Sequence, residues 1–127
     1  FRDQADAQKL LMGVQNIGDF HVVVGKANVD SMDELRKIAD LTCEKLEAGI
    51  VVLGAIIEDK VSLVVKADKD AVKLGAHAGN IIKEAAKAVG GGGGGRPDMA
   101  QAGGKIPAQL PQAFEAAVAV IRRQISA

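Results

Sequence analysis

The sequence predicts an α/β (α+β) fold, in which a small mixed or largely antiparallel sheet is covered by helices. Short β-branched runs alternate along the chain with segments whose apolar residues recur every three or four positions. Two β-rich runs are separated by only three polar residues, which is typical of an antiparallel hairpin. The 127 residues, 48% of them hydrophobic, are enough for one core between sheet and helices.

The first twelve residues are expected to be the end of a helix that enters from a preceding part of a larger protein. Their apolar residues follow a helical spacing, at Phe1, Ala5, Leu11 and Met12. A helix of this length is not stable alone, and Gly13 with the stretch 16–18 would close it. The sequence therefore divides into residues 1–12, the end of a linking helix, and residues 13–127, one globular domain.

A strand and an amphipathic helix come next. Residues 21–25 read His-Val-Val-Val-Gly, a β-branched run typical of a strand. Asp30 or Ser31 offers a helix N-cap, and Glu34 stands three residues after Ser31, as in a capping box. The helix stripe consists of Met32, Leu35, Ile38, Ala39, Thr42 and Leu46. Gly49 is the expected stop.

The middle of the chain predicts a β-hairpin. Residues 50–57 form a nearly continuous apolar run, which indicates a strand buried on both faces. The polar turn at 58–60 and the β-branched run at 61–65 complete an antiparallel pair.

Two further helices are expected. The first begins at an Asp70 N-cap, and its apolar residues are Val72, Leu74, Ala78, Ile81, Ile82, Ala85, Ala86 and Val89. Gly75 and Gly79 inside it each weaken helicity by roughly 1 kcal/mol, which close packing would tolerate. The second follows Pro107 and Pro111, and its stripe consists of Leu110, Phe114, Ala117, Val118, Ile121 and Ile125.

Six consecutive glycines, residues 90–95, separate these helices. Such a run is either a disordered linker or a loop whose backbone approaches a partner closely, since glycine permits both. It matches the dinucleotide pattern G-x-G-x-x-G only trivially, because it follows a helix rather than a strand. It also lacks the Lys-Ser/Thr of a Walker loop, because Arg96-Pro97 follows Gly95. The contact loop is favoured, and both nucleotide-binding interpretations are rejected.

The segment Gly-Gly-Gly-Gly-Gly-Arg-Pro-Asp-Met-Ala-Gln-Ala-Gly-Gly, residues 91–104, resembles the signature near the C-terminus of bacterial alanyl-tRNA synthetases. This DHHA1-type domain also follows the catalytic domain of DHH phosphoesterases, which show a shorter Gly-Gly-Gly-His version. The Arg-Pro-Asp-Met-Ala-Gln continuation favours the synthetase. The resemblance extends from about residue 20 to 127.

The resemblance implies an accessory domain, joined by a helical hairpin to the editing domain, that contacts the outer corner of the tRNA L-shape. It would help the aminoacylation and editing domains act on one tRNA, and alanine tRNA is the partner that the resemblance implies. The implied RNA-facing residues are Gly91, Gly92, Gly93, Gly94, Gly95, Arg96, Gln101, Lys105, Lys83 and Lys87. Arginine can clamp a phosphate and glutamine can contact a base edge or ribose.

Alternative roles for the same residues stay open. Arg96 could pair internally with Asp98, and Lys83 and Lys87, one turn apart, could be plain solvated helix surface. Net charge is zero, but residues 83–127 carry +3 and residues 1–82 carry −3, which points to a basic face in the C-terminal third. With no Trp or Tyr and only three Phe, recognition by stacking bases on aromatic rows is disfavoured.

No catalytic or metal centre is expected in this segment. Cys43, His21 and His77 cannot form a four-ligand zinc site, and each is expected to be structural or exposed. The parent chain implied by the resemblance is the ATP-dependent alanine–tRNA ligase, whose ATP, Mg and zinc sites would lie in other domains. The single cysteine suggests a reducing compartment, taken as the cytoplasm, and no apolar run is long enough for a membrane span.

Three functions compete at this point. The first is a tRNA-binding accessory domain, with alanine tRNA, its own editing and aminoacylation domains, and single-stranded or duplex DNA as possible partners. The second is the substrate-binding domain of a DHH-family phosphoesterase, which requires an upstream Asp-His-His domain. The third is a dimerisation module, in which the last helix, with Arg122 and Arg123, pairs with a second copy.

Overall fold

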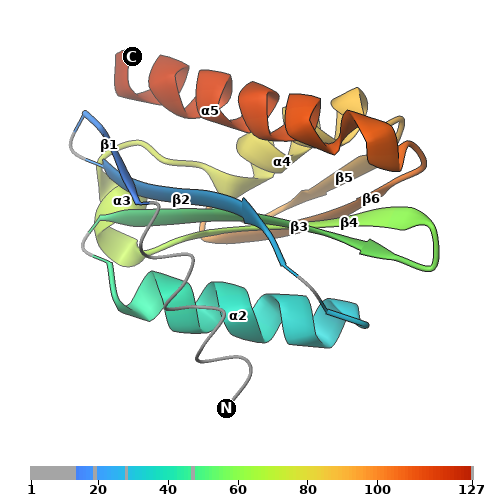
Figure 1. Ribbon diagram of the computed structural model, residues 1–127. Helices are drawn as coiled ribbons and strands as arrows, with labels where there is room; N and C mark the ends of the chain where they lie inside the picture. The colour runs from blue at the N-terminus through green and yellow to red at the C-terminus, as the bar shows by residue number, and fades with distance from the viewer. Residues whose placement is uncertain (1–13, 19, 28, 47, 127) are drawn as a thin grey trace.

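The computed structural model describes residues 14–18, 20–27, 29–46 and 48–126, which form a central sheet with helices on both faces (Figure 1). The strands are β1 (Gln15–Ile17), β2 (Phe20–Lys26), β3 (Gly49–Ile57), β4 (Lys60–Ala67), β5 (Gly92–Gly95) and β6 (Met99–Gly104). Their order in the sheet is β1-β2-β3-β4-β6-β5. Only β2 and β3 are parallel among these neighbours, and the other pairs are antiparallel. The predicted mixed, largely antiparallel sheet is confirmed.

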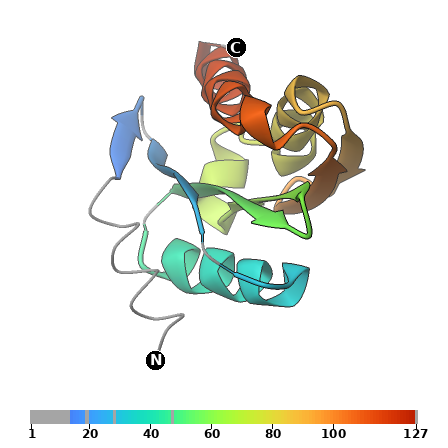
Figure 2. The same cartoon turned by 45° about the vertical axis from the view of Figure 1, so that its right-hand side comes forward.

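The helices form two layers. Helix α2 (Met32–Glu44) lies on one face of the sheet, and α4 (Ala78–Ala88) and α5 (Leu110–Ser126) lie on the other (Figure 2). The short α3 (Lys69–Lys73) follows β4, and a 3-10 turn, η1 (Pro107–Gln109), leads into α5.

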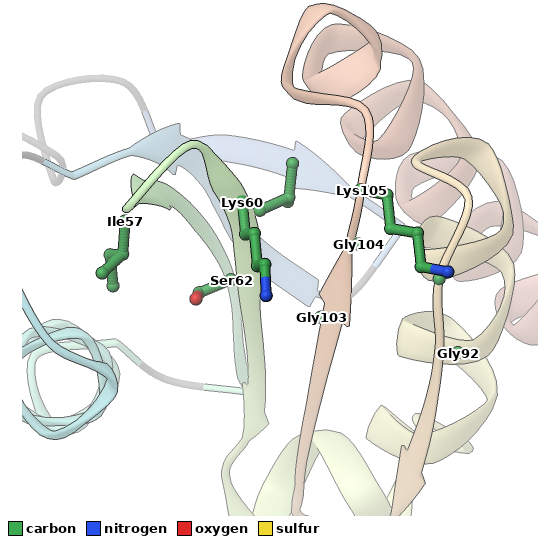
Figure 3. Close-up of a pocket in the computed structure, with 9 residues that line it drawn as sticks. Ile57, Lys60, Ser62, Gly92, Gly103, Gly104 and Lys105 are labelled. Carbon is green, nitrogen blue, oxygen red and sulfur yellow. The ribbon is translucent and has the colours of Figure 1, made fainter.

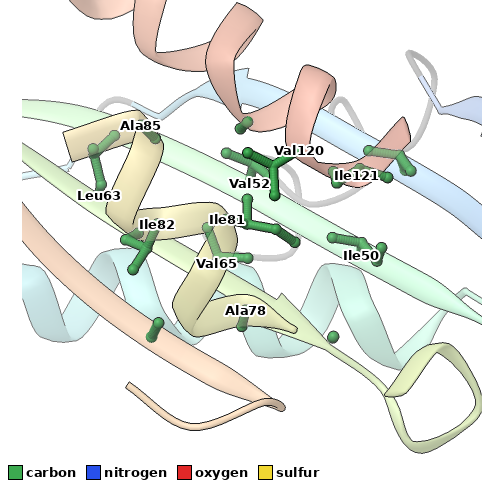
Figure 4. Close-up of a cluster of buried hydrophobic side chains, with 14 of the residues drawn as sticks. Ile50, Val52, Leu63, Val65, Ala78, Ile81, Ile82, Ala85, Val120 and Ile121 are labelled. Atoms are coloured by element: carbon green, nitrogen blue, oxygen red, sulfur yellow. The ribbon is translucent and has the colours of Figure 1, made fainter. Parts of the chain in front are cut away.

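The core is split by the sheet into two apolar clusters. Alternate residues of β3 point to opposite faces, so Ile50 and Val52 pack under α4 and α5 while Val51 and Leu53 pack under α2. Figure 4 shows Ile81, Ile82 and Ala85 of α4 and Ile121 of α5 meeting the first face. The larger cluster therefore anchors α4, the helix that adjoins the glycine segment.

Two predicted helix starts have different outcomes. The Ser31 cap is confirmed, because its Oγ accepts a hydrogen bond from the Glu34 N–H at 3.2 Å. The single helix expected from Asp70 to Val89 is wrong, since two helices occupy this stretch. Asp68, not Asp70, caps α3 by accepting from the Ala71 N–H at 2.8 Å. Gly75 ends that helix with a φ of 110°, a conformation that glycine adopts most easily.

The prediction for residues 16–18 is wrong, because they belong to a β-hairpin. Residues 16–18 were expected to close a helix, but β1 forms a hairpin with β2, and Gly18 in the turn has a φ of 60°. The helix expected at residues 1–12 lies outside the described residues.

Candidate nucleic-acid interface

The glycine segment is a strand in a β-hairpin, which corrects the predicted loop. Gly92–Gly95 pair along their whole length with β6, and the turn at 96–98 is closed by the Arg96 N–H donating to the Met99 carbonyl at 2.9 Å. Glycine has low strand propensity, so the sequence of this segment alone favours a loop. The pairing is nevertheless possible because β6 lies beside the glycines and α4 packs against one of their two faces.

Alternate glycines of this segment are required by the fold. A Cβ on Gly91 would lie 1.7 Å from the Gly103 carbonyl oxygen, and one on Gly93 would lie 2.4 Å from the Ala102 Cβ. A Cβ on Gly95 would come within 2.6 Å of the Met99 carbonyl oxygen. In contrast, a Cβ on Gly92 or Gly94 would meet nothing within 4 Å. The fold accounts for glycine at the first three positions and not at the last two.

Gly92 and Gly94 belong to an open part of the sheet. Their cross-strand partners are Gly103 and Gln101, so these four residues share one face of the β5–β6 hairpin. Helix α4 covers the opposite face, where Ala100 and Ala102 are buried. We name Gly92, Gly94, Gln101 and Gly103 the glycine shelf. Its three glycines are exposed and Gln101, its one side chain, is half-buried.

A groove adjoins one end of the shelf (Figure 3). Its volume is about 490 Å³. It is lined by Ile57, Lys60, Val61, Ser62, Gly91, Gly92, Gly103, Gly104 and Lys105. Lys105 was predicted as a contact residue, whereas Lys60 and Ser62 were not. The missing signal is the pairing of β4 with β6, which brings Ser62 opposite Gly103.

Arg96 lies at the other end of the hairpin, in the turn between β5 and β6. Its Nε is 3.7 Å from Asp98 Oδ1, so the alternative of an internal ion pair is confirmed. The two side chains are 77% and 60% exposed, and pairs in such surroundings contribute little stability. The guanidinium group therefore stays accessible to solvent.

Lys83 and Lys87 are not brought together with the shelf. Both are exposed on α4, which covers the opposite face of the hairpin. Lys87 Nζ lies 3.4 Å from Glu84 Oε1, and Lys83 lines a hollow of about 360 Å³ that also includes Arg123 of α5. The ten candidate residues thus divide among four places. Gly91, Gly92, Gly94, Gln101 and Lys105 belong to the shelf and its groove. Gly93 and Gly95 lie on the packed face of β5, Arg96 is in the turn, and Lys83 and Lys87 are on α4.

The two histidines and the cysteine do not form a chemical centre in the described part of the chain. His77 caps α4, its Nδ1 accepting from the Asn80 N–H at 3.1 Å, which confirms the structural role expected of it. Burial, with the nearby Asp68 carboxylate second, raises the pKa of the Cys43 thiol to about 12. Within residues 14–18, 20–27, 29–46 and 48–126, no group of three or more His, Cys, Asp or Glu side chains could hold a metal ion.

None of the described helices combines the length and the apolar character needed to cross a bilayer.

The chain matches known proteins over most of its length. The DHHA1 domain family matches residues 19–126. The alanine–tRNA ligase of Alkaliphilus oremlandii is 50% identical over 110 residues, which is 87% of this chain and 12% of that protein. The chain therefore spans about one eighth of the length of this relative.

Solved structures agree with this assignment. The C-Ala domain of Aquifex aeolicus alanyl-tRNA synthetase superposes with a TM-score of 0.76 and 32% identity, covering 91% of this chain and all of that one. An exopolyphosphatase-related protein from Bacteroides fragilis has a TM-score of 0.62 over 99% of this chain and 36% of its own, but its 8% identity shows a shared fold only. The chain belongs to the DHHA1 domain family, as a C-Ala domain of the alanyl-tRNA synthetase type.

Proposed function

We propose that this domain binds tRNA through the glycine shelf and the adjoining groove. The observation that carries the proposal is the open face of Gly92 and Gly94, where glycine is not needed by the fold. Glycine in a strand costs roughly 0.5–1 kcal/mol relative to alanine. A partner that comes into contact with bare backbone explains why side chains are missing there.

The chemistry of the shelf suits RNA. Gln101 stands in the middle of the open face and can donate to or accept from a base edge or a ribose hydroxyl. Lys105 at one end and Arg96 at the other supply cations for backbone phosphates. No aromatic residue lies on the shelf, so contact would depend on shape and hydrogen bonds rather than on stacking.

The resemblance extends this proposal to the parent protein. As an accessory domain of an alanine–tRNA ligase, the chain would hold the outer corner of tRNA while the aminoacylation and editing domains act on the acceptor end. Support comes from the ligases that it matches and from the C-Ala domain of Aquifex aeolicus. The phosphoesterase alternative has only a likeness of fold in its favour.

The test is filter binding of the 127-residue chain to alanine tRNA, a second tRNA and single-stranded DNA over a salt series. We expect tRNA to bind more tightly than DNA, with an affinity that falls steeply with salt. Gln101→Ala should weaken tRNA binding. The matched control is Gln112→Ala, an exposed glutamine of α5 on the opposite side of the sheet.

Each result has a clear meaning. If the wild-type chain does not bind tRNA, the proposed function is wrong. If Gln101→Ala and Gln112→Ala bind equally well, tRNA binds elsewhere on the domain. Equal affinity for tRNA and DNA would mean that the domain binds polyanions in general and does not recognise tRNA.

A further inference from the structure

Lys60 lines the groove beside the glycine shelf but is not part of the glycine motif at 91–104. It is the first residue of β4, and Lys105 directly follows the last residue of β6. Strands β4 and β6 are antiparallel, and Val61 lies opposite Gly104. The same register therefore brings Lys60 opposite Lys105. The fold thus places two lysines, distant in sequence, at neighbouring strand ends.

The groove is lined by two lysines and, among the described residues, by no carboxylate, although Glu58 and Asp59 precede Lys60 in the turn outside the lining. Neither Lys60 nor Lys105 forms an ion pair with any residue in the described part of the chain. Figure 3 shows them flanking the Gly103 and Gly104 segment, Lys60 on the β4 side and Lys105 on the β5 side. A groove with cations on both sides attracts an anionic group.

The remaining lining fits a nucleotide segment better than a free anion. Gly92 and Gly103 offer a surface without side chains, Ser62 offers a hydroxyl, and Ile57 adds an apolar wall. The volume of about 490 Å³ falls within the roughly 300–1,000 Å³ usual for small-molecule sites. A phosphate ion would occupy only part of this space.

We infer that the groove binds a sugar–phosphate segment of an RNA strand, with Lys60 and Lys105 each contacting one backbone phosphate. The nucleoside between them would rest on the surface formed by Gly92 and Gly103. This inference rests on the proposed function, because it names the part of the RNA that one end of the shelf receives. It adds Lys60 as a binding residue supplied by the β3–β4 hairpin.

The experiment compares tRNA affinity over a salt series for Lys60→Gln, Lys105→Gln and the double variant. Glutamine removes the charge and keeps a polar side chain of moderate length. Each single variant should bind roughly fivefold more weakly and lower the slope of log K against log salt by about 0.7–0.9, the value for one phosphate contact. The double variant should lower the slope by about twice as much, since the two contacts are separate.

Lys73→Gln is the matched control, because Lys73 is an exposed lysine of α3, beyond the other end of β4. Thermal unfolding of each variant verifies that the fold is kept. If wild type binds tRNA but Lys60→Gln binds like Lys73→Gln, the inference is overturned and the proposed function stands. If wild type itself does not bind, the proposed function fails and the inference with it.

Discussion

Gly79 of α4 lies so close to Gly95 of β5 that a Cβ on Gly79 would come within 2.7 Å of the Gly95 carbonyl oxygen. The Gly79 N–H also donates to the Arg96 carbonyl at 3.2 Å, so helix and hairpin are joined through backbone. Glycine inside a helix normally lowers stability, but here it allows this approach.

Gly79→Ala is therefore expected to destabilise the domain by about 1–3 kcal/mol, as overpacking does, although alanine is the better helix former. Urea unfolding measures the change. The control is Asn80→Ala at the adjacent exposed position, which should be neutral or slightly stabilising. A more stable Gly79→Ala variant would show that α4 can move away from the hairpin at no cost.

Asp68 connects two elements through one carboxylate. Its Oδ1 accepts from the Ala71 N–H of α3 at 2.8 Å, and its Oδ2 accepts from the Gly49 N–H at the start of β3 at 2.7 Å. Asp68→Ala removes both bonds and should cost about 2–3 kcal/mol, the sum of a cap and a second charge-assisted bond. Urea unfolding of Asp68→Ala and Asp70→Ala makes the comparison.

Asp70 is the matched control, because it is exposed in the first turn of the same helix and makes no capping bond. Its replacement should cost no more than about 0.5–1 kcal/mol, which is the usual size of an interaction with the helix dipole. Equal losses for the two variants would mean that Asp68 contributes only its charge.

The elements that the sequence predicted well are those with a local signal. The β3–β4 hairpin and α5 follow from apolar runs and a stripe, and the α2 cap from Ser31 and Glu34. Strands β1, β5 and β6 were missed because their residues have weak strand propensity and depend on partners elsewhere in the chain. The break at Gly75 was missed because a glycine inside a helical stripe does not reveal its φ angle.

The thiol of Cys43 is buried, and its pKa is raised from 9.0 to about 12. The unfolded chain therefore releases this proton at lower pH than the folded domain does. The thiol's contribution to stability is complete below pH 9 and is lost as the pH rises towards 12. Between pH 8 and pH 10, wild type should lose about 1.4 kcal/mol more than Cys43→Ala does in urea unfolding.

The same burial predicts slow chemistry at this sulfur. At pH 8 a thiol reagent should label folded Cys43 far more slowly than the urea-unfolded chain, since the thiolate is the reactive form. Rapid labelling of the folded domain would contradict the raised pKa.

The candidate site was only partly predictable. The motif at 91–104 predicted a contact loop where the structure has the β5–β6 hairpin, and nothing in the motif shows that alternate glycines face opposite ways. Lys83 and Lys87 were grouped with the motif by sequence distance, whereas α4 carries them over the other face. Lys60 was assigned only to a polar turn, because its proximity to Lys105 depends on the pairing of β4 with β6.

Because alternate glycines face opposite sides of β5, alanine substitutions can test the stability of the fold and the binding of RNA separately. Gly93→Ala introduces a Cβ 2.4 Å from the Ala102 Cβ and should destabilise the hairpin, by about 1–3 kcal/mol. Gly94→Ala introduces a Cβ into open space, at an ordinary φ, and should leave stability unchanged or slightly higher. On the shelf, however, that methyl group stands where the RNA would touch the backbone.

We therefore expect Gly94→Ala to unfold at the wild-type urea concentration and to bind tRNA several-fold more weakly. Urea unfolding and filter binding on the same preparations measure the two effects. Gly93→Ala provides the contrast, since its main defect should be in stability. Wild-type affinity in a fully folded Gly94→Ala variant would remove the glycine shelf from the binding surface, because a close backbone contact cannot accept an added methyl group without loss.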